Sequence, residues 1–333
     1  MKTHCQSSEI SPHPTCWTTA PHPAGSPRRS KATPSSIVAN QHCGVGVCSA
    51  HQGELVQGVI RTSEGVKRRV LLTCPRPDLV SHARFVLDTD SPAIHGAEGA
   101  SKANAAVRKT LDFLGRNKCG GQFLLNNNID SGHGNGASTA DVVAVTRAVA
   151  DACGIQLPPE DQARIAVAAE GASDGIMFDE PVLFAQREGV VVERFAGRLP
   201  PRAGLNFDTD PEGPGVDTLA LKPANFDDDE IMEFGVVIAA VRHAIHHRDV
   251  DLMGRATTAS ARLNQRFLPL RHFAAIDKIR QEVGAAGIHI SHSGTVAGMI
   301  WRLDHPELNV MMEVASEALR DLGCGRLSSY TVY

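Results

Sequence analysis

The sequence predicts an α+β protein, and three observations lead to that expectation. Short apolar stretches typical of buried strands alternate with helical stretches, but without the strict strand–helix repeat of a parallel sheet. Long helical patterns dominate the second half of the chain. Between a strand pattern and a helix pattern, the stretch "NNNIDSGHGNGASTADV" at 126–142 has three glycines at alternate positions.

The first half of the chain gives strand patterns followed by helices. Two short apolar segments, 44–48 and 54–60, flank "SAHQG", which reads as a polar turn. A helix is expected from Ser101, as its N-cap, to Leu114. The remaining elements expected here are strands at 68–74, 82–89 and 121–129, and helices at 138–154 and 158–172.

The second half opens with a hairpin around Glu188-Gly189, and a break between two subdomains is expected near 179–197. A strand at 203–210 and a closing strand at 326–333 are expected, with helices at 226–250, 272–287 and 306–323. The segment 288–303, "IHISHSGTVAGMIWRL", is expected to form a strand, a glycine turn and a helix. In the helix at 226–250, a core-facing stripe is predicted for Met232, Val236, Val237 and Ala240.

Composition narrows the class of protein. The 333 residues carry a net charge of −4, so no basic field for nucleic acid or an anionic membrane is expected. No apolar run approaches the length of a membrane-spanning helix. The eight cysteines are scattered without a C-x-x-C pair, which predicts free thiols and a cytoplasmic protein. Residues 1–38 are rich in Ser, Pro, Thr and His and are expected to be a disordered tail. They faintly resemble a transit peptide.

The glycine loop predicts a site for an anion, because glycines at a helix N-terminus let a phosphate approach the backbone amides. A Walker A loop requires a lysine after the glycines, and none is present. Gly132, Gly134 and Ala137 match the spacing of the dinucleotide-binding fingerprint. That fold requires a strand after the helix that follows the glycines, and a second helix is expected there instead. The third class is a Gly/Ser-rich loop that holds ATP phosphates directly at a helix N-terminus.

The segment "GNGASTAD", from Gly134 to Asp141, resembles the phosphate loop G-[LM]-x-S-S-[AT]-A of the GHMP small-molecule kinases. Ala137 stands where the first of the paired serines is usual, and Asn135 replaces an apolar residue. Two further segments follow in family order. "AEGASDG" at 169–175 resembles the segment that carries a metal-binding glutamate and an acidic catalytic residue, and "SHSGTVAG" at 291–298 resembles the third motif.

The N-terminal segment indicates a subfamily. "AHQGELVQGVI" at 50–60, followed by "TCP" at 73–75, resembles the "GTCGELIQG…CP" opening of L-threonine kinases of the cobalamin side-chain pathway. "STAD" at 138–141 is similar to that subfamily's loop as well. His51 and Gln52 stand where a threonine and a cysteine are usual, so an amino-acid-type acceptor is favoured while threonine itself is left open.

The resemblance implies a fold and a set of residue roles. The fold would have a ribosomal S5 domain 2-like part at 39–188, with the phosphate loop at 130–141, and a ferredoxin-like part at 189–333. The implied ligands are ATP and Mg²⁺. The loop residues implied to bind ATP are Gly132, Gly134, Asn135, Gly136, Ala137, Ser138 and Thr139.

The same resemblance assigns the chemistry. Ser138 and Glu170 would hold Mg²⁺, since oxygen donors suit that ion. Asp174 would orient or deprotonate the acceptor hydroxyl together with Ser138, with Asp179 as a competing candidate. The residues implied to bind the acceptor are Glu54, His51, Gln57, His292, Gly294 and Thr295. Glu54 is suited to an ammonium group.

Some alternatives stay open on sequence alone. Glu170, Asp174 and Glu54 can each be read as ordinary surface or turn acids. The three histidines at 243, 246 and 247 favour the C-terminal end of a helix dipole over a zinc site. The predicted activity is phosphorylation of a small hydroxy amino acid; the rivals are a non-catalytic nucleotide-binding protein and a nicotinamide-dependent oxidoreductase. The oligomeric state is open, with a homodimer as one option.

Overall fold

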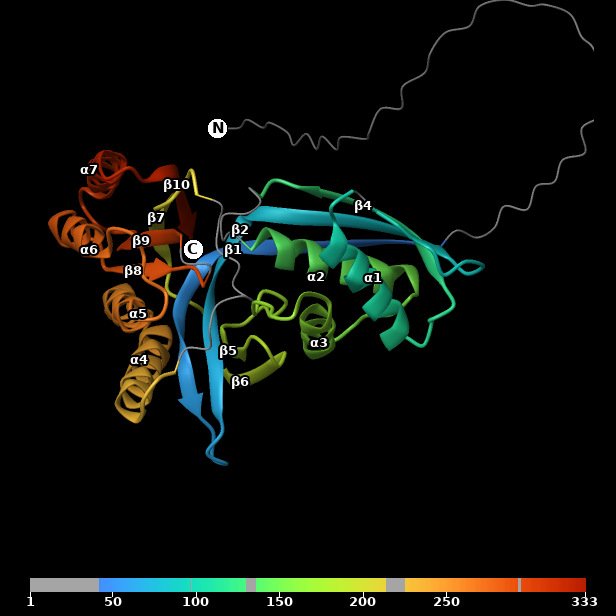
Figure 1. The fold of residues 1–333 in the computed structure, drawn as a ribbon. Helices are drawn as coiled ribbons and strands as arrows, with labels where there is room; N and C mark the ends of the chain where they lie inside the picture. The colour runs from blue at the N-terminus through green and yellow to red at the C-terminus, as the bar shows by residue number, and fades with distance from the viewer. Residues whose placement is uncertain (1–41, 97, 130–135, 214–224, 293–294) are drawn as a thin grey trace, which may run out of the picture. The chain divides into compact units, whose positions relative to one another are not determined.

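Two long antiparallel strands, β1 (Cys43–Arg61) and β2 (Lys67–Asp88), run through the centre of the fold (Figure 1). The computed structural model describes residues 42–96, 98–129, 136–213, 225–292 and 295–333. The predicted tail at 1–38 and part of the predicted phosphate loop, 130–135, lie outside these ranges. Residues 40–333 pack as one unit. The predicted boundary at 188/189 falls in the turn of a hairpin and stays a prediction.

The sequence prediction was wrong about the turn at "SAHQG" and about a gap between the strands at 68–74 and 82–89. Each pair of short segments forms one continuous strand. The polar residues of "SAHQG" lie inside β1, where the pairing with β2 shifts register between Ser49 and Val56. Such shifts are β-bulges, which bend a strand and redirect its side chains. Gly53, with φ of 100°, supplies the conformation that this bend requires.

The strands form one ten-stranded sheet with the order β10-β7-β9-β8-β1-β2-β4-β3, and β5 and β6 branch from β2. The bounds of the other strands are β3 Ile94–His95, β4 Gly120–Asn127, β5 Val182–Ala185, β6 Val190–Arg194, β7 Arg202–Asp208, β8 Gly287–Ile290, β9 Val296–Arg302 and β10 Gly325–Val332. The two halves of the sheet meet where β1 pairs with β8, and the recorded pair there is Glu54 with Ile290. The bulged part of β1 therefore sits at the joint of the sheet.

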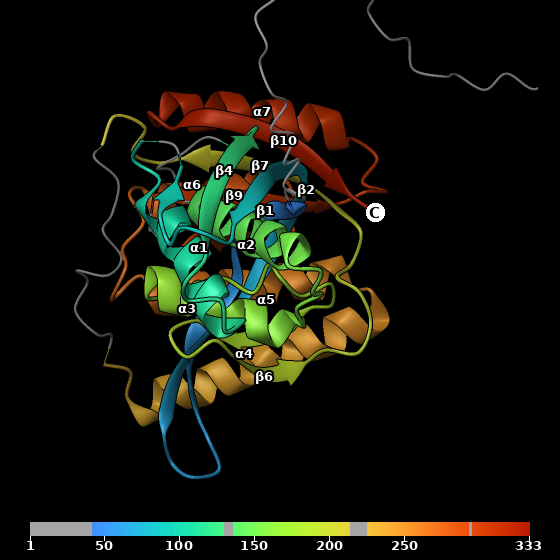
Figure 2. The ribbon, with the colours of Figure 1, turned by 90° about the vertical axis from the view of Figure 1, so that its right-hand side faces the viewer.

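Three helices cover one face of β1, β2 and β4, as Figure 2 shows from their side. They are α1 (Ser101–Phe113), α2 (Ala137–Ala152) and α3 (Pro159–Glu170). The position before α1 is Ala100, so the predicted Ser101 cap was wrong by one residue. Valines of α2 and aromatic side chains of the strands fill the core between these layers. This packing fixes the N-terminus of α2 next to the bulge in β1.

Helices α4 (Asp228–His247) and α5 (Val250–Asn264) pack side by side against the other end of β1 and β2. Helix α4 begins with a capping box, which Asp227 and Glu230 form. The predicted core stripe was partly wrong: Val237 is buried, but Met232 and Val236 are 64% and 70% exposed. Helix α5 was missed; its buried face mixes apolar residues such as Met253 and Ala256 with threonines and serines.

Helices α6 (Phe273–Glu282) and α7 (Leu308–Asp321) cover β7, β8 and β9. The helix predicted at the end of 288–303 was wrong, since Val296–Arg302 is strand β9. A short apolar run does not distinguish a buried strand from a buried helix. The six described cysteines are free thiols. Within the described ranges, no helix has both the length and the apolar character needed to cross a bilayer.

Candidate active site

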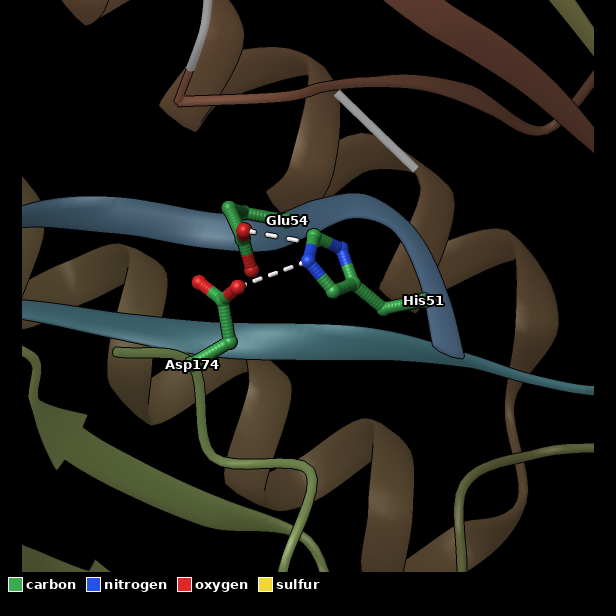
Figure 3. A group of neighbouring side chains, drawn as sticks. All are labelled: His51, Glu54 and Asp174. Carbon is green, nitrogen blue, oxygen red and sulfur yellow. Dashed lines mark hydrogen bonds and ion pairs between the residues drawn. The ribbon is translucent and has the colours of Figure 1, made fainter. Parts of the chain in front are cut away.

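Three buried side chains from separate parts of the chain meet at the bulge in β1 (Figure 3). His51 and Glu54 come from β1, and Asp174 comes from the loop that follows α3. All three are at most 3% exposed. The bulge matters here because it turns residues 51–54 away from regular alternation and brings the two side chains of β1 together.

His51 uses both ring nitrogens. Nε2 lies 2.8 Å from Asp174 Oδ2, and Nδ1 accepts a hydrogen bond from the Gly53 amide at 3.0 Å. In the neutral ring, the amide therefore favours the tautomer whose Nε2–H donates to Asp174. Burial lowers the pKa of His51, but the charges of Asp174 and Glu54 outweigh burial and raise that pKa to about 9. A protonated Nδ1 would have to leave the Gly53 amide and face Glu54 Oε1, 3.9 Å away.

Asp174 is held as a carboxylate. Burial acts to raise its pKa, but the positive charges of His51 and His292 and the hydrogen bonds to Oδ2 outweigh burial and hold the pKa well below its usual range. Oδ2 accepts from His51 and from the Thr139 hydroxyl, at 2.8 and 3.2 Å. Oδ1 has no hydrogen-bond partner within the described ranges. This leaves one oxygen of an ionised carboxylate open to an incoming donor.

Glu54 and His292 complete this end of the site. His292 Nδ1 lies 3.1 Å from Glu54 Oε1 and 3.5 Å from Asp174 Oδ1. Burial lowers the pKa of His292, but Asp174 and Glu54 outweigh burial and raise it. Oε2 of Glu54 is buried without a hydrogen-bond partner among the described residues. Among the described residues, one carboxylate oxygen of Glu54 and one of Asp174 thus accept no hydrogen bond, and each can accept one from a ligand.

The cluster of His51, Glu54 and Asp174 has ligand atoms within 4.8 Å of one another, as a metal site would. The hydrogen bonds argue against that use. A metal ligand needs a free lone pair on the imidazole, but Nδ1 accepts from Gly53 and Nε2 carries the proton donated to Asp174. The arrangement therefore fits a hydrogen-bonded cluster of a histidine with two carboxylates.

A second group, made only of oxygen donors, lies at the N-terminus of α2. Glu170, at the end of α3, accepts from the Thr139 hydroxyl at 3.0 Å and from the Ser138 hydroxyl at 3.3 Å. Burial, and then the charge of Asp174, raise the pKa of Glu170 from 4.5 to about 7. An oxygen-only set with one buried carboxylate suits Mg²⁺, which would displace the proton.

Thr139 joins the two groups. Its hydroxyl lies within hydrogen-bond distance of both Glu170 and Asp174, but it has one proton to donate. The two carboxylates therefore compete for the same donor, and this competition couples them. Thr139 was predicted only as a residue that binds ATP phosphates, so its place between the acids was not anticipated.

Gly136 lies within the predicted phosphate loop, directly before α2, and fits against His51. It precedes α2 with a left-handed φ of 67°, which favours glycine. A Cβ at this position would lie 2.1 Å from Cδ2 of His51. The chain therefore needs glycine here both for its conformation and for the space that the imidazole occupies.

The structure brings some of the predicted site residues together and leaves others apart. Joined in the site are His51, Glu54, Ser138, Thr139, Glu170, Asp174 and His292. The predicted phosphate-binding residues Gly132, Gly134 and Asn135, and the predicted acceptor-binding Gly294, lie outside the described residues. Ala137 begins α2 and is buried.

Two predicted acceptor-binding residues have their recorded contacts elsewhere. The backbone of Gln57 bonds to Ser260 and Asn264 of α5. Thr295 accepts from Thr209 through its carbonyl. Asp179, the rival to Asp174, lines a cavity of about 300 Å³ whose walls hold none of the clustered side chains. Asp174 is therefore the acid that the fold places in the cluster.

A comparison with known protein families finds a match for one part of the chain. Residues 101–184 match the family model for the GHMP kinases N terminal domain. This part of the chain is therefore similar to the N-terminal domain of GHMP kinases. It includes α1, β4, α2 and α3, and so it carries Ser138, Thr139, Glu170 and Asp174. No protein of curated function matches the sequence.

Solved structures extend the similarity to the whole fold. Homoserine kinase from Cytophaga hutchinsonii is 15% identical with a TM-score of 0.64, over 89% of this chain and 96% of that one. A mevalonate diphosphate decarboxylase from Legionella pneumophila is 13% identical with a TM-score of 0.63, over 86% and 100% of the two chains. MDDEF in complex with MVAPP, AMPPCP and magnesium is 13% identical with a TM-score of 0.63, over 87% and 100%. The α+β fold predicted from the GHMP kinase resemblance is therefore confirmed.

Proposed function

We propose that this protein is an ATP-dependent kinase that transfers the γ-phosphoryl group to the hydroxyl of L-threonine or a related hydroxy amino acid. The observation that carries the proposal is the chain of contacts from Ser138 and Thr139 through Glu170 to Asp174, inside the part of the chain that matches the GHMP kinase N-terminal domain. These contacts support the proposal because they bring Glu170, a carboxylate suited to Mg²⁺, and the ionised Asp174 to the N-terminus of the same helix.

The N-terminus of α2 is suited to the phosphates of ATP. Its unpaired amides and its dipole favour negative charge, and Gly136 gives the close approach. Ser138 and Glu170 would hold Mg²⁺, which neutralises phosphate charge as transfer proceeds. Residues of the loop at 130–135 are proposed to contribute further amides.

Asp174 would act on the acceptor. Its open Oδ1 can accept a hydrogen bond from the acceptor hydroxyl and so point the oxygen at the γ-phosphorus. As the new O–P bond forms and the bond to ADP breaks, the hydroxyl proton passes to Asp174. A carboxylate with a lowered pKa is a weak base, but a loose phosphoryl-transfer transition state asks for orientation more than for proton abstraction.

Glu54 would hold the amino group of the acceptor. Its unpartnered Oε2 is buried beside Asp174, where an ammonium group can neutralise it. The structural similarity to a homoserine kinase supports an acceptor of this class, because homoserine is itself a hydroxy amino acid. The complex of MDDEF with AMPPCP and magnesium supports the nucleotide and the metal. A cytoplasmic location stays a prediction.

A coupled ADP-release assay with Mg·ATP tests the proposal across L-threonine, L-serine, L-homoserine, ethanolamine and mevalonate. Asp174→Asn and Ser138→Ala should lose most of the activity, while Asp179→Asn, a matched acid five residues on, should keep it. Turnover only with mevalonate would retain the kinase and discard the amino acid. ATP binding without turnover of any acceptor would favour the rival reading of a non-catalytic nucleotide-binding protein, and binding of NAD in place of ATP would favour an oxidoreductase.

A further inference from the structure

We infer that the exposed face of helix α4 binds the same helix of a second copy of this chain, in an antiparallel pair that joins the two copies into a symmetric dimer. The inference goes beyond the proposed kinase activity and does not depend on it. Helix α4 lies at the outside of the fold (Figure 1). Its outer face consists of Asp229, Met232, Val236, Ala239, His243 and His246.

Helix α4 carries apolar residues on two opposite faces. One face is buried against β1, β2 and α5 and consists of Phe234, Val237, Ile238, Val241, Ala244 and Ile245. At 3.6 residues per turn, Met232, Val236 and Ala239 lie on the far side of the helix from these residues. All three are exposed, and Val236 is the most exposed large apolar side chain of any described helix, at 70%. The single chain therefore buries one apolar face of α4 and leaves the other in water.

The outer face has the spacing of a coiled-coil seam. Its six positions are separated alternately by three and four residues, and this spacing keeps them in one line along the helix. The line is about 25 Å long, from 17 steps of 1.5 Å. Met232, Val236 and Ala239 occupy its middle, where a facing helix inserts its side chains. A second helix is therefore the partner that this pattern fits.

The charges of α4 indicate which helix this is and how it runs. The first turn carries Asp228, Asp229 and Glu230, and the last turn carries His246 and His247. A second α4 in the antiparallel direction brings the acidic end of each helix beside the basic end of the other, and their dipoles then attract. A parallel copy would bring like ends together. The face is thus complementary to itself after a two-fold rotation, as a symmetric dimer requires.

The spacing also gives the register of the pair. With the two-fold axis between Val236 and Ala239, Val236 lies opposite Ala239 of the second copy, and Met232 opposite His243. The same register puts Asp229 opposite His246. Within the described part of the chain Asp229 forms no ion pair, whereas the neighbouring Asp228 already pairs with Arg61. The carboxylate of Asp229 is thus free to accept a hydrogen bond from the second copy.

Gly235 is a residue that the single chain does not explain. It lies inside α4, where glycine costs about 1 kcal/mol relative to alanine. A Cβ at this position would meet nothing within 4 Å, so the fold does not require the missing side chain. Gly235 borders the outer face beside Val236, where its bare backbone lets a second helix approach closely. The dimer gives this glycine a reason.

Sedimentation velocity of the full-length protein tests the inference. Wild type should sediment with twice the 35.5 kDa mass of the chain. Val236→Glu puts a charge from each copy into the middle of the contact and should weaken the dimer by about 100-fold or more. Val310→Glu replaces a valine of α7 that is 55% exposed, and this matched control should leave the dimer intact. Circular dichroism spectra of both variants should equal that of wild type.

A charge exchange tests the direction of the pair. Asp229→Lys and His246→Glu should each weaken the dimer about tenfold, because each puts like or unmatched charges opposite one another. The double variant should restore the wild-type dissociation constant to within about threefold. The rescue reports on contact between copies, because the two residues of one chain lie about 25 Å apart along the helix.

Each contrary outcome is distinct. A wild-type protein that stays monomeric, a dimer that Val236→Glu leaves intact, or a dimer that both valine variants dissociate would overturn the inference. So would a double variant that dissociates as readily as the single ones. Binding of monomeric wild type to vesicles of anionic phospholipid, lost in Val236→Glu, would assign the face to a membrane instead. None of these measurements uses ADP release, so a failure of the kinase proposal leaves the test unchanged.

Discussion

Two buried carboxylates four residues apart behave in opposite ways. Glu170 lies among hydroxyl groups at the N-terminus of α2, and burial raises its pKa to about 7. Asp174 lies among histidines at the bulge of β1, and their charge overcomes burial and lowers its pKa. Both side chains are buried, so their different partners, and not their exposure, decide whether each is ionised. One short segment can therefore carry two acids of different kinds. Glu170 can exchange its proton for a metal ion, whereas Asp174 stays ionised.

The largest effect is expected at the ionised acid. Asp174→Asn keeps the size and the hydrogen bond to Thr139 but removes the charge, so kcat should fall by about 10³-fold, within the range for loss of a positioned acid–base group. Steady-state ADP release measures this loss. Asp179→Asn should stay within about twofold, and an equal fall in both variants would place the chemistry elsewhere.

A substitution of His51 removes a partner of Asp174 while leaving the Asp174 carboxylate in place. In His51→Gln the effect of burial on Asp174 is less opposed, so the pKa of Asp174 should rise. Asp174 then becomes protonated at a higher pH than in wild type, and the acid limb of kcat/KM should move up by at least one pH unit. His243→Gln on the exposed face of α4 is the control. An acid limb that does not move would show that His51 does not set the charge of Asp174.

Gly136 tests the contact between the predicted phosphate loop and His51. Gly136→Ala and Gly154→Ala share a left-handed φ, 67° and 71°, so backbone strain alone should cost each variant about 1 kcal/mol of stability, and the clash at 136 adds to that loss. They differ in space: a Cβ at 136 meets His51, and one at 154 meets nothing within 4 Å. Only Gly136→Ala should therefore raise KM for ATP and lower kcat, by about tenfold. Thermal unfolding and a kinetic assay of both variants check this. Equal kcat and KM values in the two variants would show that the contact between residue 136 and His51 does not matter for activity.

The smallest effect concerns stability at the Glu170 end. Because its pKa is raised on folding, the unfolded chain loses the proton first, and wild-type stability should fall as pH rises from about 4.5 to 7. The loss is at most about 3 kcal/mol. In metal-free buffer, Glu170→Gln should unfold at a higher temperature than wild type at pH 8 and at a similar one at pH 4.5. Glu64→Gln, in the exposed turn between β1 and β2, should show no such trend. A constant difference across pH would mean that Glu170 is ionised throughout.

Much of the site followed from short motifs. Glycines before a helix, hydroxyls at its first turn and two acids after the next helix are local patterns, and they located Ser138, Glu170 and Asp174. The contact between His51 and Asp174 could not be foreseen, because 123 residues separate them and the bulge that joins them depends on the pairing of β1 with β2.

The fold was predicted where the pattern was amphipathic and missed where it was not. Helix α7 shows a clear apolar stripe, whereas the buried face of α5 mixes apolar residues with Thr257, Thr258 and Ser260, which weakens that signal. The stripe predicted for α4 included Met232 and Val236, which the structure exposes, because several faces of this helix are apolar.

The most direct measurement follows phosphorus itself. Phosphorus NMR of the protein with Mg·ATP and L-threonine, L-serine or L-homoserine distinguishes transfer from hydrolysis. The account predicts a phosphomonoester signal on one of these acceptors that grows in step with ADP, in wild type and not in Asp174→Asn. Release of inorganic phosphate alone, or no loss of the γ-phosphate signal with any of the three, would contradict it.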